Sequence, residues 1–263
     1  MRVGFGLLTL WCLAAAAMLG GWQWQRRRVN AGIVDVIWAA ALGLGALLLA
    51  ATGSGARAPR AGLALLAGAW SARLAAHLWR RVEREGEDGR YRHLRSLWGD
   101  TQWRWFALFQ LQALSVPVFA LPFAAVAANP RASPAWLAAG VALWLLGVAG
   151  EARADRQLAR FRADPANRGR TCRDGLWRYS RHPNYFFEWL HWLAYVALAV
   201  GSPLRGLSWL GPLTMWLSLR FLSGVRWTEA QALRSRGDDY RDYQRCTPML
   251  FPWFPRHSHP TRS

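Results

Sequence analysis

Lysine is missing from the sequence, and all 33 of its cationic side chains are arginine. Acidic residues are also scarce, at 15 aspartates and glutamates, so the formal net charge is +18. Cysteine occurs only at Cys12, Cys172 and Cys246, and three scattered cysteines exclude a disulfide-stapled domain. No internal repeat is present, and no Gly-x-Gly-x-x-Gly loop follows a strand, which excludes a Rossmann domain.

Histidine is rare and lacks the spacing of metal ligands, so we expect no metal. The histidines considered for this role are His182, His191, His257 and His259. Hydrophobic residues make up 53% of the chain, which excludes a disordered or collagen-like protein.

The apolar residues occur in long runs that are separated by arginines. A bilayer core of about 30 Å is crossed by a helix of roughly 20 apolar residues. Seven runs are candidates for such helices: Val3–Trp22, Ala31–Thr52, Ala61–Trp79, Trp103–Ala128, Pro134–Gly150, Tyr185–Gly201 and Gly206–Val225. We therefore predict an all-α, polytopic membrane helix bundle of about seven spans, forming one domain over residues 1–263.

The arginines are distributed unequally between the two sides of this predicted bundle. The odd-numbered loops and the C-terminal segment hold 26 of them, whereas the other side holds 5. Positive residues accumulate on the cytoplasmic side, so we place the N-terminus outside and the C-terminus in the cytoplasm. The positive charge then serves to orient the chain in the membrane and to contact anionic lipid. Nucleic-acid binding is not expected. The first run resembles a signal peptide at Ala14–Ala17, but the arginines Arg26–Arg28 favour a retained anchor.

Ionisable side chains inside the predicted spans are the first indication of a functional site, because they are costly in a bilayer. Asn184, Glu188, His191 and Tyr195 share one helical face of the sixth span. Further polar groups in the cytoplasmic halves of the spans are Asp35, Arg73 and His77. They predict a polar cavity that opens to the cytoplasm, and the alternative is a hydrogen-bonded seam between helices.

The most specific motif in the chain is Gly-Leu-Trp-Arg-Tyr-Ser-Arg-His-Pro-Asn-Tyr at residues 175–185, which continues to Glu188. It resembles the steroid 5-alpha-reductase-like family of integral membrane reductases, whose bacterial members share this signature. Weaker similarities extend the resemblance to roughly residues 35–252. The resemblance implies a seven-helix bundle that binds NADPH from the cytoplasm and transfers hydride to the conjugated carbon–carbon double bond of a lipidic, steroid- or isoprenoid-like enone.

The resemblance also implies a set of cofactor-binding residues. Guanidinium groups suit the 2′-phosphate of NADPH, because they bind phosphate bidentately. The predicted phosphate-binding residues are Arg160, Arg170, Arg178 and Arg181. The remaining predicted cofactor-binding residues are Asp155, Tyr179, His182, Asn184, Tyr185, Glu188, Tyr240 and Tyr243.

The predicted catalytic residues depart from the family pattern. In the steroid reductases an acid and a tyrosine on the second and third spans polarise the substrate carbonyl, but the third span here has no tyrosine. The available groups are Asp35, His77, Glu87 and Tyr91. Our hypothesis is that Asp35, with His77 or Tyr91, polarises the acceptor.

Two other functions remain open from the sequence. A membrane S-adenosylmethionine-dependent methyltransferase of the isoprenylcysteine or phospholipid type also carries Arg-His-Pro-x-Tyr. Asn184, Glu188 and the single Glu229 favour the reductase, because methyltransferases commonly have glycine after the tyrosine and paired glutamates in the tail. A sterol- or isoprenoid-binding scaffold without activity is the second alternative. The predicted partners are the lipid bilayer, in a bacterial inner membrane, and a hydrophobic small molecule; the sequence names neither the substrate nor the oligomeric state.

Overall fold

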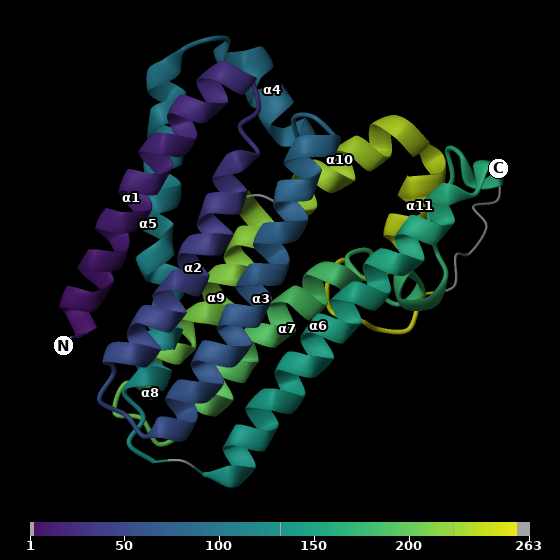
Figure 1. Cartoon of the computed structure of the whole chain (residues 1–263). Coiled ribbons are helices and arrows are strands. Elements are labelled where there is room, and N and C mark those ends of the chain that lie inside the picture. The colour runs from purple at the N-terminus through teal and green to yellow at the C-terminus, as the bar shows by residue number, and fades with distance from the viewer. Residues whose placement is uncertain (1–2, 132, 223, 257–263) are drawn as a thin grey trace. The chain divides into compact units, whose positions relative to one another are not determined.

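The protein is an all-α, multi-pass helical membrane protein. The computed structural model describes residues 3–131, 133–222 and 224–256, and these ranges contain helices and no strand (Figure 1). Four helices are long and apolar enough to cross a membrane: α1 (Val3–Arg28), α2 (Ile33–Thr52), α5 (Gln102–Ala127) and α6 (Pro134–Ala163). They correspond to four of the seven predicted spans, and the chain is therefore polytopic.

The other three predicted spans are helical, but their helices are not both long and apolar enough to be candidate membrane spans. The third is α3 (Arg57–Arg84), the sixth is α7 (Pro183–Leu198) with 16 residues, and the seventh is divided. Its parts are α8 (Arg205–Ser208), α9 (Leu210–Leu217) and the π-helical turn η3 (Ser218–Leu222).

Three of the long helices continue beyond the apolar runs that predicted them. The runs end at Trp22, Trp79 and Gly150, whereas α1, α3 and α6 end at Arg28, Arg84 and Ala163. Arginine is a good helix former, and positive side chains in the last turn stabilise a helix through its dipole. The arginine-rich ends are therefore helical extensions and not loops.

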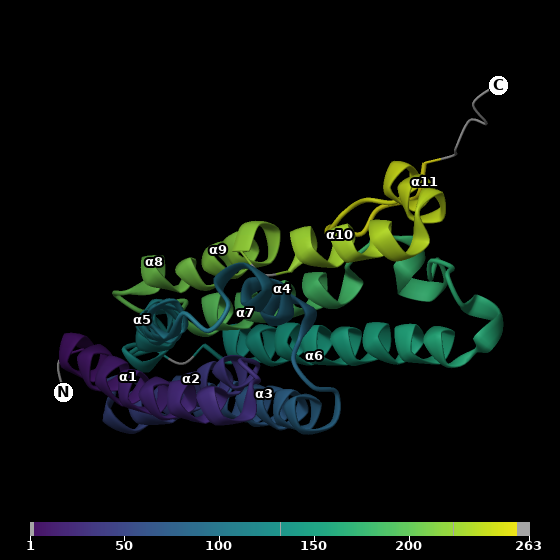
Figure 2. The same cartoon turned by 90° about the horizontal axis from the view of Figure 1, so that it is seen from above.

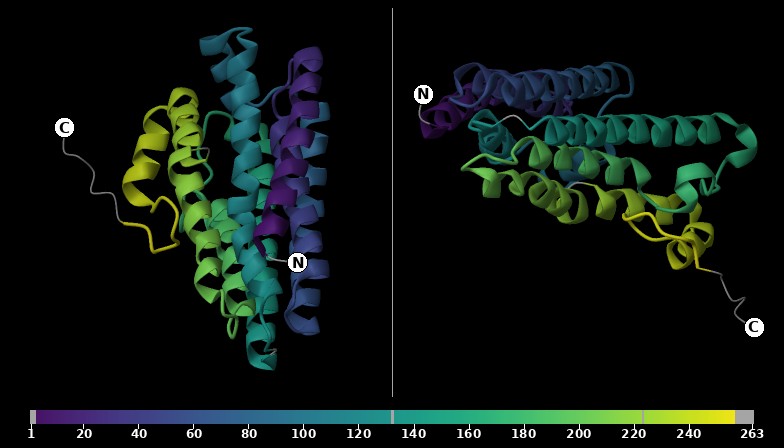
Figure 3. Two further views of the ribbon diagram at one scale, coloured as in Figure 1. Left: turned by 90° about the vertical axis from the view of Figure 1, so that its left-hand side faces the viewer. Right: turned by 90° about the horizontal axis from the view of Figure 1, so that it is seen from below.

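The chain divides into two compact units. Unit 1 comprises Met1–Val141 and Ala194–Gly211, and unit 2 comprises Ala142–Leu193 and Pro212–Ser263. In unit 1, α1, α2 and α3 are neighbours (Figures 1 and 2), and α5 packs against α1 (Figure 3), α2, α3 and α8. The largest fully buried side chains there include Trp70, Trp105, Phe109 and Phe123. The prediction of one domain over residues 1–263 stays a prediction.

Small residues allow α2 and α3 to approach closely in unit 1. The hydroxyl of Ser71 on α3 donates to the carbonyl of Ala39 at 2.6 Å, and a Cβ at Gly43 would collide with the Ser71 side chain. α5 contains Pro117 and Pro122, each of which removes one helical hydrogen bond. The indole of Trp38 on α2 donates to Ser115 on α5 at 3.0 Å. Polar contacts thus join α2 to α3 and to α5.

Unit 2 is built from α6 after Val141, α7 up to Leu193, α9 from Pro212 onward and several short helices. The 3₁₀ turns η1 (Pro165–Asn167) and η2 (Gly175–Arg178) follow α6, and α10 (Val225–Arg236) and α11 (Asp238–Cys246) follow η3. α10 packs on α11 (Figure 2), around a cluster of Ala232, Tyr240 and Tyr243. Glycines also bring α6 close to α7, because a Cβ at Gly150 would collide with Phe187.

Candidate functional site

The first candidate cluster lies in unit 1 around Asp35, in the first turn of α2. The phenol of Tyr91 donates to one Asp35 oxygen at 2.9 Å, and Arg90 donates to the other at 2.9 Å. Tyr91 and Arg90 belong to the short helix α4 (Gly89–Trp98). A carboxylate at a helix N-terminus is stabilised by the helix dipole. Asp35 therefore forms an ion pair that also fixes the orientation of a phenol.

Burial controls the protonation of this phenol. Tyr91 is 5% exposed, and its burial, followed by the negative charge of Asp35, raises its pKa well above the ordinary value. At neutral pH the phenol consequently keeps its proton and acts as a hydrogen-bond donor. Arg90 balances the charge of Asp35, so the carboxylate would not be left unpaired if the phenol turned to another acceptor.

The neighbouring acids hold α4 in place. Asp88 caps α4 by accepting from the backbone of Arg90 at 2.8 Å, and it pairs with Arg81 at 2.6 Å. Glu87 accepts from the backbone of Ala31 at 2.9 Å and from Arg95 at 2.7 Å. Arg95 also donates to the other oxygen of Glu87 at 2.9 Å, so both oxygens are occupied, and neither forms a hydrogen bond with Asp35 or Tyr91.

The second candidate cluster is the 175–185 motif in unit 2, which begins as a tight turn against α6. Gly175 has φ +59°, a left-handed conformation that favours glycine. Gln157 on α6 accepts from the backbone of Leu176 at 3.0 Å, and the indole of Trp177 donates to the carbonyl of Ala154 at 2.9 Å. From α11, the phenol of Tyr243 donates to the carbonyl of Trp177. The motif is therefore fixed to helices before and after it in the chain.

Glu229 on α10 is the centre of the motif's charged contacts. It accepts from Arg181 at 2.7 Å and from Gln244 at 2.8 Å, and it lies 3.2 Å from Nε2 of His182. Arg181 also donates to the carbonyls of Gln244 and Thr247 at 3.0 and 2.8 Å. Arg181, His182 and Glu229 have side chains that are 12%, 3% and 15% exposed. We call these three side chains, together with Gln244, the Glu229 cluster.

Protonation in the Glu229 cluster follows from these contacts. Burial opposes ionisation, but the hydrogen bonds from His182 and Arg181 lower the pKa of Glu229 to about 2. Burial lowers the pKa of His182, although Glu229 counteracts part of this effect. At neutral pH the cluster therefore consists of an ionised Glu229, a charged Arg181 and a neutral His182, whose Nε2–H donates to the carboxylate.

Other motif residues join α7 to its neighbours within unit 2. The amide of Asn184 donates to Asp155 on α6 at 3.1 Å, and the hydroxyl of Tyr185 lies 3.4 Å from that of Thr228. The rings of His182 and Tyr185 stack, with centroids 5.3 Å apart and an interplanar angle of 6°. One turn further on, Glu188 lies 3.7 Å from Nδ1 of His191.

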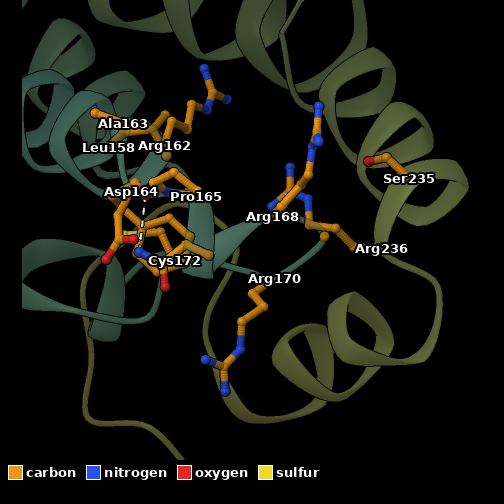
Figure 4. Close-up of a pocket in the computed structure, with 13 residues that line it drawn as sticks. Leu158, Arg162, Ala163, Asp164, Pro165, Arg168, Arg170, Cys172, Ser235 and Arg236 are labelled. Atoms are coloured by element: carbon orange, nitrogen blue, oxygen red, sulfur yellow. Dashed lines mark hydrogen bonds between the residues drawn. The ribbon is translucent and has the colours of Figure 1, made fainter.

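An arginine-lined pocket is the third candidate, also within unit 2. It has a volume of about 560 Å³ and lies between the end of α6, the η1 turn and the end of α10. Four arginines line it, against one acid, Asp164: Arg162, Arg168, Arg170 and Arg236. Figure 4 shows Arg168 and Arg236 in the space between these segments, with Arg162 above them and Arg170 below. Asp164 is already used, because it caps η1 at the backbone of Ala166.

The sequence matches the family described as "Protein of unknown function (DUF1295)" over residues 21–247. The chain belongs to the DUF1295 family. It is also similar to an uncharacterized protein of Schizosaccharomyces pombe, at 29% identity over 217 residues, which are 72% of this chain and 62% of the relative. The chain thus spans less than two thirds of the relative's length, and no solved structure matches it.

The DUF1295 match contains every residue predicted for the site, and the structure brings only some of them together. Asp35 contacts Tyr91, as one form of the hypothesis states, whereas His77 is exposed on α3 and forms no hydrogen bond with Asp35. The orientation of α3 explains this, since sequence spacing does not show which face of a helix turns inward. Glu87 belongs to the separate contact with Arg95.

Besides Asp155, Asn184, Tyr185 and Glu188, whose contacts are given above, the predicted cofactor residues of this DUF1295 protein fall into three groups. Arg170 lines the arginine-lined pocket, and Arg178 lines a neighbouring cavity of about 400 Å³ together with Tyr243. Arg181 and His182 belong to the Glu229 cluster, and Tyr240 lies close enough for Glu229 to raise its pKa further, after burial. Arg160 and Tyr179 are exposed, on α6 and after η2.

The sequence did not point to Glu229, which accepts the hydrogen bonds of Arg181 and His182, or to three of the four arginines of the pocket. In the sequence, Glu229 served only to separate two protein families. Its carboxylate binds Arg181, which lies 48 positions earlier in the chain. Arg162, Arg168 and Arg236 were not selected, although a cluster of arginines at residues 160–170 was visible as a signal. Among the described residues no group of three or more histidines, cysteines or acids could hold a metal, and His257 and His259 lie outside that part of the chain.

Proposed function

We propose that this DUF1295 protein is a membrane reductase that uses NADPH to reduce the conjugated carbon–carbon double bond of a lipidic enone. The proposal includes the finer topology, with seven spans, the N-terminus outside and the C-terminus in the cytoplasm of a bacterium, in the inner membrane. It rests on the resemblance of the 175–185 motif to the steroid 5-alpha-reductase-like family and on the chemistry of the two units.

The observation that carries the proposal is the arginine-lined pocket. Its arginines Arg162, Arg168, Arg170 and Arg236 face a single acid that is already hydrogen-bonded to backbone. NADPH is a polyanion with a 2′-phosphate, and guanidinium groups bind phosphate with charge-assisted hydrogen bonds. S-adenosylmethionine carries a sulfonium cation, which this charge would repel. The donor set therefore fits the reductase cofactor and disfavours that of the methyltransferase.

The residues of unit 1 fit the second requirement of the reaction, which is a donor for the substrate carbonyl. NADPH supplies the hydride, and negative charge then develops on the carbonyl oxygen as enolate character. Tyr91 is protonated at neutral pH, and its phenol could donate to that oxygen by turning away from Asp35. Arg90 would keep Asp35 paired during this exchange. A donor placed where charge develops stabilises the transition state.

Ligand-induced thermal stabilisation of the detergent-purified protein tests the cofactor. We expect NADPH to raise the apparent Tm, with a smaller effect from NADH and none from S-adenosylmethionine. Arg168→Gln and Arg236→Gln should each weaken NADPH binding about 10- to 100-fold, because a hydrogen bond to a charged group contributes about 1.5–3 kcal/mol. Arg153→Gln is the matched control, since Arg153 is exposed on α6 and lies outside the pocket.

The outcomes separate the candidate functions. Stabilisation by S-adenosylmethionine alone would refute the reductase and move the search to methyl acceptors. Equal NADPH affinity in the two pocket variants and the control would refute the pocket assignment. A panel of lipid enones, followed through the loss of reduced nicotinamide and the mass of the product, tests turnover. NADPH that binds and is never oxidised would indicate the non-enzymatic scaffold.

A further inference from the structure

The segment that follows α11 presents an unusual group of exposed aromatic rings. Phe251, Trp253 and Phe254 are 49%, 72% and 73% exposed, and Tyr179 beside them is 36% exposed. Tyr179 and Phe254 meet edge to face, with centroids 6.0 Å apart. We call these four residues the aromatic tail patch. Exposed rings of this size, gathered in one place, mark an interaction surface.

The backbone beneath the patch is held firmly. The carbonyl of Pro248 accepts from the backbone of Arg181 at 2.9 Å, and that of Leu250 accepts from the hydroxyl of Ser180 at 2.8 Å. The backbone of Trp253 donates to the carbonyl of Tyr179 at 3.0 Å. These contacts order the segment, so the outward position of its rings is part of the fold of unit 2.

The patch continues onto the start of α7. The ring of Phe251 packs on Trp189, with centroids 5.2 Å apart, and on Phe186, with centroids 6.1 Å apart. In the proposed function, on whose topology this inference rests, α7 enters the membrane from the cytoplasm at this end. The rings are therefore level with the boundary between lipid and water, where tryptophan and other aromatic side chains accumulate.

The charges around the patch fit an anionic surface. Arg178, Arg245 and Arg256 are all exposed and flank the aromatic residues in the chain. Arginines at a membrane surface are attracted to anionic lipid. Aromatic rings for the interfacial layer and cations for the headgroups are the two components of an interfacial anchor.

We propose that the aromatic tail patch docks on the cytoplasmic leaflet, with Trp253 and Phe254 inserted at the headgroup level. The bound surface is that of an anionic phospholipid bilayer. The segment after α11 thus binds Arg181 of the motif, through Thr247 and Pro248, on one side and the membrane on the other. This anchor would fix unit 2 against the leaflet from which a lipidic substrate arrives.

Site-directed fluorescence in nanodiscs tests the anchor. In a full-length background with all three native cysteines replaced, Phe254→Cys carries an environment-sensitive dye, and Gln231→Cys on the exposed face of α10 is the control. We expect blue-shifted emission at position 254 and severalfold greater quenching by lipids with nitroxide near the headgroup than at position 231. Quenching should increase when phosphatidylglycerol is added to phosphatidylcholine, and Arg256→Gln should reduce this increase.

Two results would overturn the proposal. Equal aqueous emission and quenching by iodide at positions 254 and 231 would show that the patch faces water. Blue-shifted emission without quenching by the lipid nitroxides would show that protein, such as a second copy of the chain, covers the patch. NADPH stabilisation measured on the same labelled samples reports separately on the proposed function, so failure of one hypothesis is distinguishable from failure of the other.

Discussion

Replacement of Glu229 by glutamine is the sharpest test of the Glu229 cluster. The substitution keeps the size of the side chain and removes its charge. Arg181 would lose its carboxylate at 2.7 Å, and the new amide would place a donor where His182 and Gln244 now donate. Arg181 would keep its two backbone carbonyls, so we expect destabilisation of unit 2 and not its complete unfolding.

The magnitude follows from the pKa of Glu229, which is lowered from the ordinary 4.5 to about 2. This difference corresponds to about 3 kcal/mol at neutral pH, and partial exposure of the pair reduces the expected loss to about 2–3 kcal/mol. A carboxylate with a lowered pKa stabilises the folded state fully above pH 4.5, and this contribution disappears as the pH falls toward 2. The wild type and Glu229→Gln should therefore converge in stability within this acidic range.

The assay is the apparent Tm in detergent, followed by intrinsic fluorescence over a series of pH values. Glu229→Gln should lower the Tm at pH 7 by about 5–10 °C, since each kcal/mol corresponds to about 2–4 °C in a chain of this size. Glu85→Gln is the matched control, because Glu85 is 69% exposed and forms only a surface pair with Arg81. Such pairs contribute about 0–1 kcal/mol.

A constant difference between the wild type and Glu229→Gln at every pH would refute the reasoning, because it would show that charge is not involved. A Tm equal to that of Glu85→Gln at pH 7 would also refute it. Burial lowers the pKa of His182, which makes both proteins less stable as the pH falls below 6.5. Because Glu229 raises the pKa of His182, Glu229→Gln should deepen this loss, so the convergence is measured below pH 4.5, where Glu229 itself titrates.

Three further predictions concern other parts of the structure. Tyr91→Phe should lower kcat about 10- to 100-fold and leave NADPH-induced stabilisation unchanged, because Asp35 keeps Arg90; unchanged turnover would remove Tyr91 from the mechanism. Gly175→Ala should cost more than about 1 kcal/mol of stability in thermal unfolding, since φ is +59° and the new Cβ would collide with Gln157, and an unaltered Tm would contradict this strain. Cys172 is 3% exposed and burial raises its pKa, so it should resist maleimide at neutral pH in peptide mass spectrometry, and rapid labelling would show that it opens to solvent.

Helix content was predictable because apolar runs of about the length needed to cross a bilayer predict helices. The run Ala31–Thr52 predicted α2 closely, because the helix stops where the apolar run stops. α2 begins two residues later, at Ile33, and ends at the same residue, Thr52. The ends of α1, α3 and α6 were not predictable from the same rule. Arginine ends an apolar run, but it is a good helix former, so the helix continues.

Only one pairing in the site, that of Asp35 with Tyr91, was named from the sequence, and it was one of two choices. The structure places the phenol of Tyr91 2.9 Å from Asp35, whereas His77, the other choice, is exposed on α3. Arg181 was expected to bind phosphate. In the structure its guanidinium donates hydrogen bonds to Glu229 and to the carbonyls of Gln244 and Thr247. Periodicity describes one element at a time, so it carries no information on pairing between distant segments.

The contacts of the 175–185 motif with the segment after α11 have a consequence for the biogenesis of the protein. The hydroxyl of Ser180 and the side chain of Arg181 bind partners that are 70 and 66 positions later in the chain. Unit 1 is also completed late, by Ala194–Gly211, after the first part of unit 2 has been synthesised. During vectorial insertion, an arginine and a histidine of the motif must therefore wait without their carboxylate until α10 emerges. Nascent chains arrested before α10 should be the forms most exposed to membrane quality-control proteases.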